Sequence, residues 1–216
     1  MHCIIIGMKT VIWDFNGTII DDAALSLHIE NEMRKKRGMD REITLDEYRE
    51  LFCFPVINYY YKVGYTFENE TYEDIAVEYH EQYDALFHTC KLMDGFMEKI
   101  HESIEKGYQN VILSASMHDA LIDQCKQLHI DHLFTEILGI DNRLAESKID
   151  MAKRWMDNAN VKPDECMYIG DTTHDLETAS ALNIDNCILI STGHQSYDVL
   201  KAVTENVVHT LQEVVL

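Results

Sequence analysis

Residues 9–18 read KTVIWDFNGT, and this short stretch decides the class of fold. The run from Lys9 to Trp13 is rich in strand-forming residues and ends abruptly at the polar sequence Asp14-Phe15-Asn16-Gly17-Thr18. Asp14 should therefore lie at the carboxyl end of a strand. Open α/β sheets bind their ligands at that edge, so Asp14 is the first candidate for a functional side chain.

The rest of the chain falls into a helical block and a region of alternating elements. From Asp21 to Cys90 the pattern predicts three helices: one from Asp21 or Asp22 to Gly38, one from Thr44 to near Pro55, and one over about 70–90. Beyond Cys90, helices alternate with short apolar runs that predict strands at 110–113, 134–138, 166–169, 187–190 and 206–208. This alternation predicts an α/β fold with a parallel, Rossmann-like sheet flanked by helices on both faces.

The helical block predicts a second, smaller structural unit. It leaves the sheet beside Asp14, so it is placed to cover the site, exclude water and select the substrate. We therefore expect an α/β core domain formed by residues 1–20 and 91–216, and an all-helical cap domain formed by residues 21–90. Residues 1–7 have no assigned role.

Composition narrows the range of partners. The chain has 38 acidic residues against 18 Lys and Arg, a formal net charge of −20, which repels nucleic acids and anionic membranes. Its six cysteines show no C-x-x-C spacing, and the apolar residues near the start are too few to span a bilayer. We expect a cytoplasmic protein with reduced thiols and a small-molecule partner, either a monomer or a homodimer.

Two of the predicted strand ends carry groups suited to phosphoryl transfer. An aspartate such as Asp14 can attack phosphorus, and Gly17 and Thr18 would bring backbone and hydroxyl donors close. Ser114, followed by Ala115, ends the strand at 110–113 and can hold a phosphoryl oxygen. Each short segment alone is also compatible with an ordinary turn or a helix cap.

Two later segments complete the constellation. Lys148 stands near the start of a predicted helix, where its ammonium group can neutralise both a nucleophilic carboxylate and the transferred group. Asp171 and Asp175, four residues apart after the strand at 166–169, are typical ligands for a hard cation when combined with Asp14. The preferred cation is Mg²⁺, although Asp175 can instead cap the helix that follows it.

These four elements, in this order, resemble the motifs of the haloacid dehalogenase-like hydrolases over nearly the whole chain. The helical insertion after the first motif resembles the cap of the phosphoglycolate phosphatase-like branch. The resemblance implies a phosphatase that forms an aspartyl phosphate. It assigns three groups of residues: catalytic Asp14, Asn16 and Lys148; phosphate-binding Gly17, Thr18, Ser114, Ala115 and Lys148; and metal-binding Asp14, Asn16 through its backbone carbonyl, Asp171 and Asp175.

Position 16 departs from the family pattern. Phosphatases of this family usually carry a second aspartate there, which protonates the leaving oxygen and then activates water, but this chain has Asn16. An amide donates hydrogen bonds but does not transfer protons at neutral pH, and loss of this assistance typically costs about 10²- to 10⁴-fold in rate. The preferred interpretation is a phosphatase that acts on a good leaving group or uses another proton carrier, such as His118 or His174.

Two other interpretations stay open at this point. Relatives that cleave phosphonates or carbon–halogen bonds also lack this aspartate, and a phosphonate-cleaving enzyme would need a cap lysine, for which Lys62 is the candidate. The chain is alternatively a binding or regulatory protein with little turnover. In either case, the aromatic residues of the helical block are candidates to contact the substrate: Phe52, Phe54, Tyr59, Tyr60, Tyr61 and Tyr65.

Overall fold

The computed structural model describes residues 9–140 and 148–216, and its centre is a six-stranded sheet. The strand order is β5-β4-β1-β6-β7-β8, and every neighbouring pair is parallel. The strands are β1 (Thr10–Trp13), β4 (Gln109–Met117), β5 (Glu136–Ile140), β6 (Cys166–Gly170), β7 (Cys187–Ile190) and β8 (Val207–Val208). The predicted α/β class with a parallel sheet is confirmed, and β4 extends four residues beyond its expected end at Leu113.

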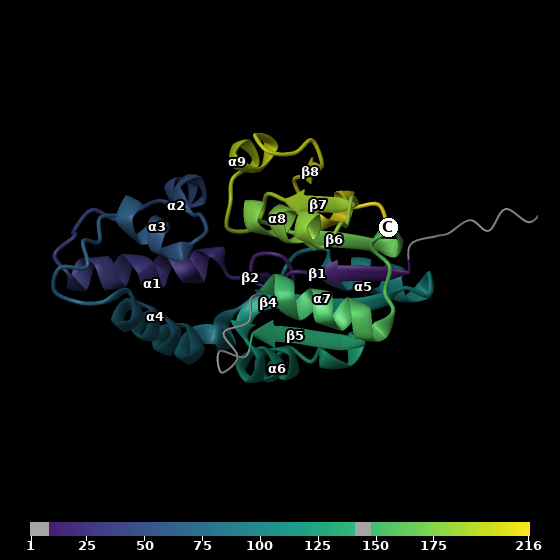
Figure 1. The fold of residues 1–216 in the computed structure, drawn as a ribbon. Helices are drawn as coiled ribbons and strands as arrows, with labels where there is room; N and C mark the ends of the chain where they lie inside the picture. Colours follow the sequence, from purple (N-terminus) through teal and green to yellow (C-terminus); the bar gives the residue numbers. More distant parts are fainter. Residues whose placement is uncertain (1–8, 141–147) are drawn as a thin grey trace, which may run out of the picture.

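Side-chain alternation along β1 explains how helices cover both faces of the sheet. Val11 and Ile12 point to opposite faces because consecutive strand residues alternate. Val11 belongs to an apolar cluster with residues of α5 (Phe96–Glu105) and α6 (His118–Gln127). Ile12 belongs to a second cluster, built with residues from α7 (Lys148–Ala159), α8 (Thr173–Ala181) and α9 (Tyr197–Lys201). Figure 1 shows the helices arranged around the sheet in this way.

The register of the sheet fixes where the loops that follow the strands meet. Trp13, the last residue of β1, is paired with Ile112 of β4 on one side and with Ile169 of β6 on the other. The backbone amide of Asp14 still donates to the carbonyl of Ile169 at 2.9 Å. Asp14 therefore leaves β1 at the same edge at which β4 and β6 end, which is the carboxyl edge of the parallel sheet.

The four helices formed within residues 23–86 lie beyond this edge of the sheet, on the left of Figure 1. They are α1 (Ala23–Lys36), α2 (Leu45–Leu51), α3 (Val56–Lys62) and α4 (Tyr72–Leu86). Thr44 and Thr71 form capping boxes at the starts of α2 and α4. The expected helix capped by Thr44 is α2, which ends at Leu51, four residues before Pro55. Helix α3, whose N-cap residue is Pro55, was not expected.

A two-stranded antiparallel ribbon stands where the chain enters and leaves the helical segment. It pairs β2 (Ile20–Asp21) with β3 (Lys91–Leu92), and Asp22 then becomes the N-cap residue of α1. The proposed domain limits at residues 20/21 and 90/91 fall at this ribbon. Short 3₁₀ helices complete the described elements: Phe87–Thr89, Asp131–Leu133, Pro163–Glu165 and Leu211–Glu213.

Two further findings concern expectations from composition. Among the described residues, no helix combines the length and the apolar character needed to cross a bilayer. The described cysteines are free thiols: Cys53, Cys90, Cys125, Cys166 and Cys187.

Candidate active site

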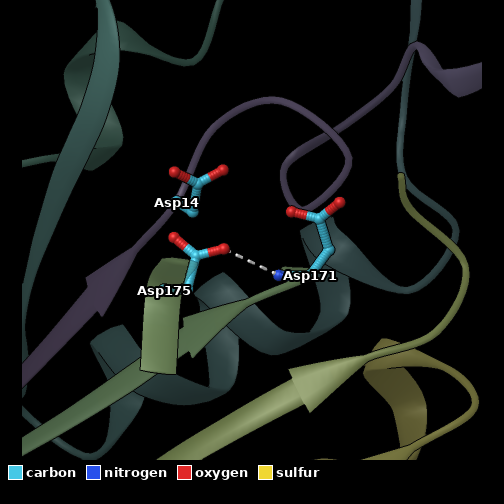
Figure 2. A group of neighbouring side chains, drawn as sticks. All are labelled: Asp14, Asp171 and Asp175. Atoms are coloured by element: carbon cyan, nitrogen blue, oxygen red, sulfur yellow. Dashed lines mark hydrogen bonds between the residues drawn. The ribbon is translucent and has the colours of Figure 1, made fainter. Parts of the chain in front are cut away.

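Three carboxylates meet at the carboxyl edge of the sheet. Asp14 follows β1, Asp171 follows β6, and Asp175 lies in the first turn of α8. One oxygen from each lies within 4.8 Å of the others, and all three side chains are buried. Figure 2 shows the three groups converging from separate elements. The sequence motifs that contain them are thus brought to one point by the register of β1 and β6.

Lys148 is the cation that accompanies this group. Its ammonium nitrogen Nζ lies 2.6 Å from Asp14 Oδ1 and 2.9 Å from Asp175 Oδ1, and its side chain is buried. Burial by itself lowers the pKa of Lys148, but the two carboxylates raise it well above its usual value. Lys148 therefore stays charged and holds Asp14 in a fixed orientation.

One lysine does not balance three buried carboxylates. Burial, with the added repulsion from Asp175, raises the pKa of Asp14 well above its ordinary value despite Lys148. Burial also raises the pKa of Asp171 to about 7. A divalent cation would remove this excess of negative charge, and closely spaced carboxylate oxygens are the ligands that Mg²⁺ prefers. The residues present therefore fit a magnesium ion.

Asp175 is already heavily engaged by the protein. Its Oδ2 accepts hydrogen bonds from the backbone amides of Asp171 and Thr172, at 3.2 and 3.0 Å, and from the Thr172 hydroxyl at 2.8 Å. Its Oδ1 accepts from Lys148 and from the Tyr168 hydroxyl, at 2.9 and 3.2 Å. Asp175 thus caps α8 and anchors Lys148, and its role as a direct metal ligand stays a prediction.

Gly17 permits the close packing of the loop after Asp14 against Asp171. Its φ is +71°, and a Cβ added to it would lie 2.2 Å from Asp171 Oδ2 and 2.7 Å from His194 Cδ2. The Gly17 amide donates to Asp22, and the Thr18 hydroxyl lies 3.3 Å from Asp171 Oδ1. The Gly17 amide and the Thr18 hydroxyl, which were expected to bind phosphate, are therefore directed at protein carboxylates. Their phosphate-binding role stays a prediction that these contacts do not support.

Ser114 and Ala115 lie where the phosphate-binding motif is expected. Both line the same cavity as Asp14 and Lys148. The Ser114 hydroxyl lies 3.1 Å from Ser116 Oγ and accepts a hydrogen bond from the Ser116 amide at 3.1 Å. Ser116 therefore fixes the position of the Ser114 hydroxyl at the end of β4 that lines the cavity.

The Asn16 side chain is held from both ends of its amide. Its nitrogen donates to Asp22 Oδ2 and to the Tyr83 hydroxyl, both at 2.9 Å. Its oxygen accepts a hydrogen bond from the Ser116 hydroxyl at 3.0 Å. These three partners fix the orientation of the amide, with its oxygen toward the end of β4 and its nitrogen toward α1 and α4.

Asp22, which the sequence predicts only as a helix cap, is the centre of a buried hydrogen-bond network. Its carboxylate accepts hydrogen bonds from four donors: the Gly17 amide, the Asn16 amide, the Tyr83 hydroxyl and His194 Nε2. Burial tends to raise the pKa of Asp22, but the charge of His194 and these hydrogen bonds lower it below its ordinary value. Asp22 therefore stays ionised next to Asn16.

His194 is the buried histidine of the site, and neither motif nor spacing pointed to it. Its Nε2 lies 3.2 Å from Asp22 Oδ1, its Nδ1 lies 2.8 Å from the Tyr48 hydroxyl, and its backbone amide donates to Asp171 Oδ2 at 2.6 Å. Burial lowers its pKa, but Asp22 more than offsets this and raises the pKa to about 9. Its position directly after Gly193, within a polar loop, is the one weak signal in the sequence.

Of the two histidines predicted as proton carriers, His174 lines the cavity and His118 does not. His174 lines the cavity and stacks on Phe54, with ring centroids 4.6 Å apart, while its Nδ1 faces Glu177 at 3.3 Å. His118 is only half-buried and is not among the residues that line the cavity. A role for either as a proton carrier stays a prediction.

A cavity of about 430 Å³ extends from the carboxylates into the helical segment. Asp14, Lys148 and Asp171 line one end, and the rest is lined by residues of α1–α4 together with residues of β4 and α6. The aromatic candidates that line it are Phe52, Phe54, Tyr59 and Tyr60. Tyr61 is 55% exposed, and Tyr65 is buried but does not line the cavity.

Comparisons with known proteins agree with this arrangement. The family model described as haloacid dehalogenase-like hydrolase matches residues 11–189. The pyrophosphatase PpaX of Listeria monocytogenes is 24% identical over 177 residues, which are 79% of this chain and 77% of that protein. A haloacid dehalogenase-like hydrolase from Bacteroides fragilis has a similar fold, with a TM-score of 0.80, 17% identity, and coverage of 96% of this chain and 100% of that one.

A third similar structure was solved with a ligand. CbbY from Rhodobacter sphaeroides, in complex with xylulose-(1,5)-bisphosphate, superposes with a TM-score of 0.72 at 19% identity. The match covers 95% of this chain and 96% of that one. At this identity the likeness concerns the fold, and it includes both the sheet and the helical segment.

Proposed function

Since the chain belongs to the haloacid dehalogenase-like hydrolases, we propose that it is a magnesium-dependent phosphatase that acts on a small phosphorylated metabolite. The observation that carries this proposal is the buried contact of 2.6 Å between Lys148 Nζ and Asp14 Oδ1, inside a group of three carboxylates. A carboxylate held in this way beside a cation is prepared to attack phosphorus.

In the proposed reaction, a carboxylate oxygen of Asp14 attacks the phosphorus and the bond to the leaving oxygen breaks. Lys148 neutralises charge on the nucleophile and on the transferred group, while Ser114 donates to a phosphoryl oxygen. Water then cleaves the aspartyl phosphate, which releases phosphate and restores Asp14. Mg²⁺, held by Asp14, Asp171 and the backbone carbonyl of Asn16, would supply positive charge to the phosphoryl oxygens.

Asn16 limits which leaving groups depart readily. Its amide is fixed by Asp22, Tyr83 and Ser116 and carries no acidic proton at neutral pH. A substrate whose leaving group is stable without protonation, such as an acyl phosphate or pyrophosphate, avoids this difficulty. The similarity to a pyrophosphatase supports this part of the proposal.

We also propose that residues 21–90 act as the cap domain of this enzyme and that the enzyme works in the cytoplasm. This segment supplies half of the residues that line the cavity beside Asp14, which supports a role in covering the substrate. The free thiols support a reducing compartment. The alternative of phosphonate cleavage has no comparable support, because Lys62 is exposed, donates to the Leu51 carbonyl at 3.2 Å and does not line the cavity.

The test is phosphate release from pyrophosphate, acetyl phosphate, p-nitrophenyl phosphate and alkyl phosphates, with and without Mg²⁺. We expect Mg²⁺-dependent turnover that Asp14→Asn abolishes and that the matched control Asp94→Asn, an exposed aspartate, leaves intact. Good leaving groups should be favoured over alkyl phosphates. Absence of turnover on every compound, with magnesium-dependent ligand binding retained, would instead identify a binding protein.

A further inference from the structure

The face of α1 that lines the cavity carries a row of buried polar groups. Asp22, Ser26 and Glu30 follow one another at intervals of four residues, so they lie on one side of the helix. Their exposed fractions are 1%, 2% and 2%, and all three line the cavity. The row begins beside Asn16 at the reacting end and runs into the helical segment.

Helix α4 supplies partners for the first two members of this row but not for the third. The Tyr83 hydroxyl donates to Asp22 Oδ2 at 2.7 Å, and the Tyr79 hydroxyl donates to Ser26 Oγ at 2.8 Å. The residue one further step of four along α4 is Ile75, whose buried side chain has no donor. Opposite Glu30, the regular pairing of α1 with α4 therefore stops.

The carboxyl group of Glu30 has one oxygen without a partner. Within the described part of the chain, Glu30 Oε1 is buried and accepts no hydrogen bond. Arg34 lies nearby, but its Nε and Nη1 donate to the backbone carbonyls of Val63 and Arg41. A buried carboxylate oxygen without a hydrogen-bond partner destabilises the folded protein, so a ligand that donates a hydrogen bond to Glu30 would bind favourably.

A second nearby arginine and the surrounding tyrosines do not fill this need. Arg37 forms ion pairs with Glu70 and Glu78. The Tyr65 hydroxyl is close enough to Glu30 to lower the pKa of its carboxyl group, but within the described residues neither it nor the buried Tyr59 hydroxyl forms a hydrogen bond of normal geometry. Burial raises the pKa of Glu30 to about 7, against the lowering effects of Tyr65, Arg34 and Arg37, as expected for an acid that lacks a close counter-charge.

The walls of this end of the cavity suit a positively charged group. Among the cavity-lining residues that the structure describes, the one lysine or arginine is Lys148, and it is paired with Asp14 and Asp175 at the opposite end. The far end instead offers Glu30 and the rings of lining tyrosines, which attract cations through their faces. These residues are Tyr59, Tyr60, Tyr72 and Tyr79. Among the described residues that line this end, no lysine or arginine is present to balance a second phosphate group.

We propose that the far end of the cavity binds a positively charged nitrogen of the substrate, held by Glu30 and the tyrosine rings. This inference rests on the proposed phosphatase function. It defines the substrate class as phosphorylated compounds that carry an ammonium group at the end away from phosphorus. Glu30 lies eight residues beyond Asp22, about 12 Å along the helix axis, and its side chain leans back toward the helix start. The charged nitrogen should therefore lie roughly 8 to 12 Å from phosphorus.

The inference is tested with two matched series of ligands on the Mg²⁺-loaded full chain. The first series consists of ω-ammonioalkyl phosphates with two to eight carbons, and the second of alkyl phosphates of equal length. Their dissociation constants are measured by calorimetry and by competition with p-nitrophenyl phosphate. We expect equal affinity for the shortest pair, and at least about tenfold tighter binding of the ammonium compound for chains of about six to eight carbons.

Variants then assign the preference to Glu30. Glu30→Gln keeps the shape of the side chain and should reduce the ammonium preference to nearly one, whereas Glu32→Gln, an exposed position on the same helix, should leave it unchanged. Thermal unfolding checks that both variants fold. The length dependence in the wild type tests the idea even if Glu30→Gln does not fold.

Three outcomes would overturn the inference: an ammonium preference that does not vary with length, a preference that survives in a folded Glu30→Gln variant, or equal binding of ω-hydroxyalkyl phosphates. The last would show that the site takes neutral donors. Failure of the phosphatase function is a separate result, because p-nitrophenyl phosphate would then not be hydrolysed while calorimetry still reports binding.

Discussion

The Asn16 side-chain nitrogen donates to Asp22 Oδ2 at 2.9 Å, so an amide occupies the position where the family's phosphatases usually carry an acid, and a carboxylate stands directly behind it. Asp22 is buried and ionised, and it starts the first helix of the segment that covers the site. Position 16 lacks the acid, but the Asp22 carboxylate lies one hydrogen bond away from the Asn16 amide.

Exchanging these two residues tests whether position 16 limits the reaction. Asn16→Asp alone places two carboxylates in contact, so they must share a proton, and the variant should lose about 1 to 3 kcal/mol of stability. The double variant Asn16→Asp/Asp22→Asn restores a carboxylate–amide pair in the reverse order and should recover most of this loss. Chemical denaturation of the wild type, the two single variants and the double variant measures this recovery of stability.

The same cycle has a kinetic readout. The double variant should hydrolyse alkyl phosphates about 10²-fold faster or more than the wild type, with a much smaller gain on p-nitrophenyl phosphate, because only the poor leaving group needs a proton. Equal gains on both compounds, or no gain in the double variant, would show that the amide at position 16 does not limit turnover.

Replacing Asp171 or Asp175 by asparagine should have different effects on stability and on Mg²⁺ binding. Asp171→Asn removes one of three mutually repelling carboxylates, so we expect a stability change within about 1 kcal/mol and at least tenfold weaker Mg²⁺ binding. Asp175→Asn removes the acceptor that caps α8 and anchors Lys148, so we expect a loss of about 1 to 3 kcal/mol, with a smaller effect on Mg²⁺ affinity. Calorimetry with Mg²⁺ and urea unfolding in EDTA separate the two phenotypes, and a reversed pattern would make Asp175 the principal ligand.

The raised pKa of Glu30 predicts how stability depends on pH. Burial moves the pKa from 4.5 to about 7, so the favourable contribution of the protonated acid is complete below about pH 4.5 and is lost as the pH rises through 7. A shift of this size corresponds to roughly 3 kcal/mol. Relative to wild type, Glu30→Gln should therefore gain roughly that much stability between pH 5 and pH 8.5.

Urea unfolding at pH 5, 7 and 8.5, without ligand, measures this difference. Glu32→Gln serves as the control, since it makes the same chemical change at an exposed position of α1. Stability curves for Glu30→Gln and wild type that stay parallel across this range would show that Glu30 is compensated by a partner in solution.

The sheet was predictable because its strands are strongly apolar and end in polar loops. The run before Asp14 and the run before Asp171 carry this signal, and the parallel register then brings both aspartates to one edge. The β2–β3 ribbon was not foreseen, since strands of two residues are too short to show an alternating pattern. Helix α3 was missed because Pro55 was taken only as the stop of the helix before it, whereas it is also the N-cap residue of α3.

The buried network around Asn16 could not be found from local patterns. Its members come from distant parts of the chain: Asp22, Tyr83 and His194. Asp22 also satisfies the simpler description of a helix cap, which conceals its second role. A pairing of residues 172 positions apart depends on how the helical segment and the last loop pack, and this information is not contained in any one motif.

Helix α1 links substrate choice to reactivity through one rigid body. Its first residues follow Asp22, which fixes the amide of Asn16, and two turns later the same helix presents Glu30 to the far end of the cavity. We therefore expect a ligand that tilts the outer part of α1 to displace the groups beside Asp14 as well. Changes of substrate preference in this enzyme should accordingly appear in the turnover number as well as in binding, even when the altered side chain never approaches the phosphate.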